Sequence, residues 1–254
     1  MTFGALGLVI YGAHAALTSD WMRDAEIRAT DSFNLKVSEA GFNVQNLLID
    51  GRVHIDREQL KKLLGIQKNT SIFAYDLEAI QERLSKISWV KSAIVERRLP
   101  DTIYVRLEER VPVALWHRNG KLSLVDSEGF VLADKNLQAF NHMIVITGDN
   151  APNNAAELVG LIRVEPELQD RIEIARWIGN RRWDIKLKNG ITLRLPEDDA
   201  GFAIKRLSEA QKNEQVLDRQ VEAIDLRDPM RIVVQTAPGA VDKYEAGYKK
   251  EKNI

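Results

Sequence analysis

The side chains that most often perform catalysis or hold metals are few in this chain and far apart. The four histidines, His14, His54, His117 and His142, have no spacing typical of metal ligands. Cysteine is absent, which excludes disulfides, thiolate catalysis and zinc–thiolate sites. The sequence also lacks the G-x-S-x-G, H-E-x-x-H, P-loop and G-x-G-x-x-G motifs. It therefore predicts neither a nucleophile nor a metal centre.

Two pairs of adjacent carboxylates remain as candidates for acid–base chemistry. Glu108 and Glu109 lie in an alternating segment, so their side chains are expected on opposite faces of a strand. Asp198 and Asp199 precede a predicted helix, where the helix dipole favours negative charge. Both pairs thus have a structural explanation. We predict a protein with no catalytic residues, no metal and no cofactor.

The composition is that of a folded protein with one or two domains. Of its 254 residues, 44% are hydrophobic and 29% are charged. The formal net charge of -1 points to neither nucleic acid nor a strongly acidic partner.

Residues 2–19 form an uncharged, largely apolar segment. As a helix it would span roughly 27 Å, about the thickness of a bilayer core. We predict a transmembrane anchor over residues 1–19, and two alternatives remain open. One is a secretory signal, since Ala13-His14-Ala15 has the A-x-A form, and the other is a buried globular helix. The anchor is favoured because a secretory signal requires a Lys or Arg before its apolar run, and here none precedes it. The same lack of basic residues leaves the membrane orientation undetermined.

Residues 20–41 are polar, and we interpret them as a linker; a helix is the alternative. Residues 42–113 then show the order strand, helix, helix, strand, strand. Apolar runs predict strands over 44–50, 89–99 and 102–109. Asp56 and Gly65 are typical of a helix start and a helix end, and Asp76 of a second start. The apolar stripes of the two helices are Leu60, Leu63 and Leu64, and Leu77, Ile80, Leu84 and Ile87.

Alternating segments predominate over residues 114–237, separated by turn signals of which Asn189-Gly190 is the strongest. Helices are expected over 155–164 and after Asp199, and closing strands over 221–226 and 231–236. Residues 238–254 are polar, which predicts a disordered tail. The fold class is therefore α+β.

Two helices on one face of a three-stranded sheet is the plan of a POTRA module. Within it, the runs WVKSA (89–93), RRLPDTI (97–103) and ERVPVALW (109–116) closely resemble the FtsQ/DivIB family of bacterial cell-division proteins. Further phrases in the second half resemble the same family: Leu124-Val125-Asp126, Arg181-Arg182-Trp183-Asp184 and Ile224-Asp225-Leu226-Arg227. The resemblance covers residues 1–237.

The resemblance implies a POTRA-like domain over 42–113 with β-α-α-β-β order, followed by a β-rich domain with packed helices over 114–237. Because proteins of this family normally carry a cytoplasmic tail before the anchor, it also implies that the natural protein begins upstream of Met1.

The function implied by the resemblance is that of a non-catalytic, single-pass scaffold of the inner membrane, with its bulk in the periplasm and enriched at the septum. Such a protein binds FtsB and FtsL, works with FtsW, FtsI, FtsK and FtsN, regulates septal peptidoglycan synthesis and contacts no nucleic acid. The alternative is a POTRA-containing accessory of outer-membrane protein assembly or secretion. That role predicts further POTRA repeats or a barrel, and the sequence shows one module.

The final predicted strand is the candidate partner site. Taken alone, its residues leave two possibilities open, an exposed sheet edge or a strand paired on both sides. The resemblance implies that FtsB adds a strand here, that Arg227 pairs with a partner carboxylate, and that Arg181 or Arg182 assists. The sequence departs from the family pattern at 228–230, where an aromatic residue can occur. The expected partner-binding residues are Arg227, Met230, Arg231, Ile232, Val233, Val234, Gln235, Arg181 and Arg182.

Overall fold

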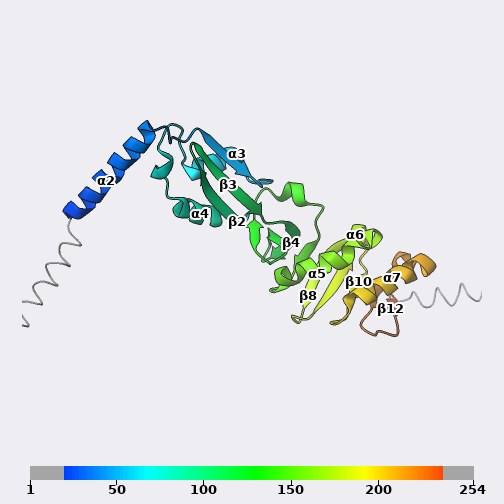
Figure 1. Ribbon diagram of the computed structural model, residues 1–254. Coiled ribbons are helices and arrows are strands. Elements are labelled where there is room, and N and C mark those ends of the chain that lie inside the picture. The colour runs from blue at the N-terminus through cyan, green and yellow to red at the C-terminus, as the bar shows by residue number, and fades with distance from the viewer. Residues whose placement is uncertain (1–19, 237–254) are drawn as a thin grey trace, which may run out of the picture. The chain divides into compact units, whose positions relative to one another are not determined.

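The computed structural model describes residues 20–236, which form two compact units that divide between Glu109 and Arg110 (Figure 1). The expected anchor over 1–19 and the expected tail over 238–254 lie outside the described residues. Within residues 20–236, no helix combines the length and the apolar character needed to span a bilayer. The predicted α+β class is confirmed for both units.

The first unit has the predicted β-α-α-β-β order. Its elements are α2 (Asp20–Glu39), β1 (Asn46–Asp50), α3 (Arg57–Leu64), the short 3₁₀ helix η1 (Ile72–Ala74), α4 (Leu77–Ser85), β2 (Val90–Arg98) and β3 (Thr102–Glu109). The strand order is β1-β3-β2, with β1 parallel and β2 antiparallel to the central β3. The stretch for which the sequence favours a linker is helical over α2.

Local side-chain chemistry places α3 and α4 where the sequence predicts them. The Asp56 carboxylate accepts a hydrogen bond from the Gln59 amide at 2.8 Å, and Asp76 accepts one from Ala79 at 3.0 Å. Gly65 ends α3 in the left-handed conformation, with φ 65°. The prediction that Leu63 belongs to the buried stripe of α3 is wrong, because its side chain lies at the margin of that stripe and is 40% exposed.

The core of the first unit lies between the helices and the sheet. Ile80 and Leu84 of α4 are buried in one cluster with Ile103 and Val105 of β3. At the end of β1, Gly51 adopts φ 78°, and a Cβ there would lie 1.9 Å from the Leu107 carbonyl oxygen. This close approach of two backbones requires glycine.

The second unit is built on one nine-stranded sheet with the order β12-β11-β10-β9-β8-β7-β4-β5-β6. Its elements are β4 (Pro112–Arg118), β5 (Lys121–Asp126), β6 (Val131–Ala133), η2 (Leu137–Phe140), β7 (Val145–Thr147), α5 (Ala151–Arg163), α6 (Pro166–Arg171), β8 (Ile172–Ile178), β9 (Arg182–Leu187), β10 (Thr192–Arg194), α7 (Ala200–Glu214), η3 (Val216–Asp218), β11 (Val221–Asp225) and β12 (Val233–Thr236). The helix expected over 155–164 begins earlier, and the last strand is shorter than expected.

The helices α5 and α7 cover one face of this sheet, as the ribbon shows (Figure 1). Leu158 of α5 and Leu207 of α7 belong to the same buried cluster as Ile185 of β9 and Ile224 of β11. Since side chains alternate along a strand, the neighbours of these strand residues lie on the opposite face. Phe202 of α7 lies outside this cluster and is 50% exposed.

Candidate interaction site

The last strand lies at the edge of the sheet. Strand β12 pairs antiparallel with β11, and within the described residues no strand lies on its other side. Its four residues are all exposed. Within residues 20–236, the strand therefore lies at an exposed sheet edge, which is the first of the two possibilities that its residues leave open.

Register determines which face each residue of β12 joins. Val234 pairs with the fully buried Ile224, so it continues the buried row on the helix-covered face, where it is still 38% exposed. Val233 pairs with Asp225 and lies on the open face, 54% exposed. Ile232, which precedes the strand, packs partly against the core.

The loop before β12 presents two further expected residues to solvent. Met230 is 85% exposed, and its amide donates a hydrogen bond to Asp228 at 2.8 Å. The side chain of Arg231 is 81% exposed and lies 3.7 Å from the Asp228 carboxylate. On the strand itself, the Gln235 amide nitrogen is 3.5 Å from Glu222. Apart from Ile232, the expected residues of this segment are accessible.

Arg227 is held by the carboxylate of Asp225, which is not among the predicted site residues. Its Nε lies 2.9 Å from Oδ1 of Asp225, and its Nη2 lies 2.5 Å from Oδ2. These hydrogen bonds raise the pKa of Arg227 and lower the pKa of Asp225. Nη1 makes no hydrogen bond within residues 20–236, and the side chain is 47% exposed. The pair therefore leaves one edge of the guanidinium free.

The two arginines before Trp183 point to different neighbours. Arg182 Nε lies 3.4 Å from Asp184 Oδ1, and its side chain is 20% exposed. Arg181 lies 3.8 Å from Glu197, in the loop that leads to α7. Because Trp183 is buried under the helices, Arg182 and Asp184 share the open face. The carboxylate of Asp184 also contributes, after Asp225, to the raised pKa of Arg227. The structure thus groups Arg182 with Arg227.

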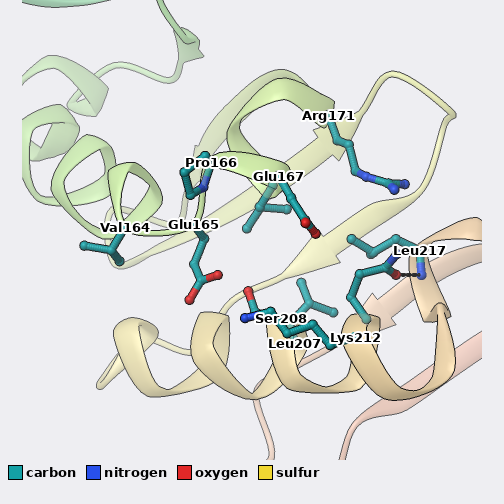
Figure 2. A pocket seen from close by; sticks show the side chains of 11 residues that line it. Val164, Glu165, Pro166, Glu167, Arg171, Leu207, Ser208, Lys212 and Leu217 are labelled. Atoms are coloured by element: carbon teal, nitrogen blue, oxygen red, sulfur yellow. Dashed lines mark hydrogen bonds between the residues drawn. The ribbon is translucent and has the colours of Figure 1, made fainter.

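The cavity between α6 and α7 in the second unit offers no catalytic arrangement. A cavity of about 180 Å³ lies between α6 and α7 over an apolar floor that includes Leu207 and Leu217 (Figure 2). Glu165 and Glu167 come from the α6 side, and Lys212 from α7 (Figure 2). Ser208 supplies the one hydroxyl among these lining side chains, and within the described residues it makes no hydrogen bond to a base that could activate it. Within the described residues, no three His, Cys, Asp or Glu side chains are grouped to hold a metal.

Comparison with known proteins gives two family matches that together span both units. Residues 42–110 match the POTRA domain of FtsQ type. Residues 114–227 match the C-terminal domain of cell division protein FtsQ/DivIB.

Individual proteins with the name cell division protein FtsQ are also similar to the chain. The Rickettsia typhi protein is 36% identical over 198 residues, which are 78% of this chain and 74% of that protein. The Bradyrhizobium diazoefficiens protein is 28% identical over 253 residues, 99% of this chain and 72% of the relative. The Zymomonas mobilis protein is 36% identical over 205 residues, 80% of this chain and 65% of the relative.

Proposed function

Because the chain belongs to the FtsQ/DivIB family of non-enzymatic cell division proteins, we propose that it is a membrane-anchored scaffold that captures FtsB by strand addition at β12. With FtsB and FtsL bound, it links early and late division proteins and regulates septal peptidoglycan synthesis. FtsW, FtsI, FtsK and FtsN are its further proposed partners. The alternative role in outer-membrane assembly or secretion is set aside, because the C-terminal match is to the division family.

The observation that supports strand capture is the unpaired edge of β12. An edge strand exposes main-chain N–H and C=O groups that pair with an incoming strand. Proteins usually protect such edges with lysine, proline or a covering segment. The four residues from Val233 to Thr236 contain neither lysine nor proline, and all four are exposed. This edge is therefore suited to accept a strand.

Two adjacent proline variants test the strand addition. Along an edge strand, successive N–H groups point alternately toward the neighbouring strand and outward, so one of Val233→Pro and Val234→Pro removes an outward donor. Both variants should lose capture of FtsB in a pull-down, and the outward one should keep the wild-type melting temperature.

A proline at the opposite edge of the same sheet is the matched control. Val131→Pro in β6 should leave capture unchanged, since β6 is the far end of the strand order. Undiminished binding of FtsB by both folded β12 variants would exclude strand addition at this edge.

The proposed anchor is residues 2–19, with the bulk of the chain in the periplasm and concentrated at the septum. Its support is the uncharged apolar sequence and the family membership. The protein should stay in the membrane fraction through carbonate washing, with residues 40–237 open to protease from the periplasmic side. A soluble periplasmic form beginning near Ala16 would establish a cleaved signal instead.

A further inference from the structure

The open face of the nine-stranded sheet carries a row of alternating charges that ends at the edge strand. Strand pairing aligns, in order, Arg176, Asp184, Arg194, Asp225 and Val233 on β8, β9, β10, β11 and β12. Paired residues on adjacent strands have their Cβ atoms about 5 Å apart on the same face. The row therefore runs unbroken across five neighbouring strands.

This row faces away from the helices. The residues beside it along the strands are Ala175, Ile185, Leu193 and Ile224, all fully buried in the core under α5 and α7. The charged residues of the row are exposed or half-buried. Solvent and partners thus reach the row from the open face.

The charges on this face do not balance. Asp184 bonds to Arg182, and Asp225 bonds to Arg227. The side chains of Arg176 and Arg194 make no hydrogen bond or close ion pair with any residue between 20 and 236. Four guanidinium groups thus share two carboxylates. Arg194 is half-buried between two carboxylates that other arginines already occupy, so its donors remain available to an external acceptor.

We propose that Arg194 is a further partner-binding residue: beside Arg227 and Arg182, which the family resemblance already implies, it receives a carboxylate of an acidic partner segment that adjoins the strand added to β12. The proposal rests on the proposed function, since the added strand brings the segment to this face. Val233 is the uncharged, 54% exposed end of the row, so a segment that crosses from the edge meets it first and Arg227 and Arg194 next. Guanidinium groups bind carboxylates through two parallel hydrogen bonds, which suits glutamate or aspartate side chains.

The test measures binding of FtsB from the same organism to the full chain over a range of salt concentrations. Arg194→Glu should weaken binding by about tenfold and flatten its salt dependence, because a reversed charge repels the partner carboxylate. Arg194→Gln, which keeps size and polarity, should weaken binding by about threefold. Arg176→Glu, two strands further from β12, should have a smaller effect than Arg194→Glu.

Arg163→Glu is the matched control, because Arg163 is an exposed arginine in the last turn of α5, on the helix-covered side of the sheet. It should change binding by less than about twofold. Equal losses in Arg163→Glu and Arg194→Glu, or no loss in either Arg194 variant with unchanged melting temperature, would overturn the proposal. Strand addition is decided separately by the proline variants. If they lose capture while Arg194→Glu does not, the acidic segment is wrong and the edge site stands.

Discussion

Glu109, at the end of β3, fixes the loop between β1 and α3, and its replacement by glutamine should destabilise the first unit. The carboxylate accepts hydrogen bonds from the backbone amides of Val53, His54 and Ile55 at 2.8, 2.7 and 3.0 Å. Its side chain is 4% exposed, and the His54 ring lies 3.1 Å away. One buried carboxylate thus satisfies three consecutive amides.

The magnitude follows from what glutamine can offer at this position. Its single carbonyl oxygen replaces one carboxylate oxygen, and its NH₂ group faces an amide donor in place of the other. A hydrogen bond to a charged group contributes about 1.5–3 kcal/mol, and a buried donor without an acceptor costs about 1–3 kcal/mol. Glu109→Gln should therefore lower the free energy of unfolding by about 2–4 kcal/mol.

The effect should depend on pH in a defined direction. Burial raises the pKa of Glu109, but the hydrogen bonds from the amides of His54, Ile55 and Val53 outweigh it, so the pKa in the folded state is lowered. A lowered pKa stabilises the fold above the unfolded-state value of about 4.3, and this contribution is lost as the pH falls through the folded-state pKa. The difference between wild type and Glu109→Gln should be constant from neutral pH to about 5 and shrink below about 4.

Urea unfolding of the full chain measures this difference in the free energy of unfolding between wild type and Glu109→Gln. Hydrogen exchange of the amides of residues 53–55 measures whether the loop itself is affected. The control is Glu108→Gln, because Glu108 is exposed on the same strand and its side chain accepts from Ser92 at 2.9 Å. The control should change stability by less than about 0.5 kcal/mol. Equal losses in the two variants, or a Glu109→Gln loss that persists unchanged at low pH, would refute the reasoning.

Two further substitutions test the packing of the first unit. Leu84→Ala should lower the free energy of unfolding, measured in urea, by about 2–5 kcal/mol, because Leu84 is fully buried. The exposed Leu63 is the control, and Leu63→Ala should lower it by less than about 1 kcal/mol. An equally small loss for Leu84→Ala would mean that α4 is peripheral. Gly51→Ala should lower the melting temperature by several degrees, because its Cβ would lie 1.9 Å from the Leu107 carbonyl oxygen. An unchanged melting temperature would show that β1 and β3 separate freely at this point.

The elements that the sequence predicted well are those with a local cause. Asp56, Asp76 and Gly65 act through hydrogen bonds or backbone conformation within four residues, so their types were enough to locate α3 and α4. The prediction that Glu108 and Glu109 face opposite sides needed only strand alternation. It did not reveal what Glu109 does, because its amide partners lie more than fifty residues away in the chain.

The candidate site depends on non-local pairing, and for that reason the sequence specified it only in part. The edge position of β12 follows from its pairing with β11, and the row through Arg194 follows from β10 lying parallel to β11. Neither pairing has a signature in the residues themselves. The sequence also could not separate Arg181 from Arg182, whereas the buried Trp183 separates them in the structure. Asp225 carried a signal, since a carboxylate two residues before Arg227 is within its reach.

Backbone pairing at β12 would contribute affinity to the partner site, and the arginines in and beside the charged row would contribute selectivity. Main-chain groups accept almost any extended segment, so an edge strand alone gives affinity with little selectivity. Selectivity requires groups that penalise the wrong partner, and uncompensated guanidinium groups do so when a segment brings no carboxylate. In the unbound protein, the ion pair with Asp225 compensates the charge of Arg227. A segment must therefore both extend along β12 and carry acidic side chains to gain from the whole surface.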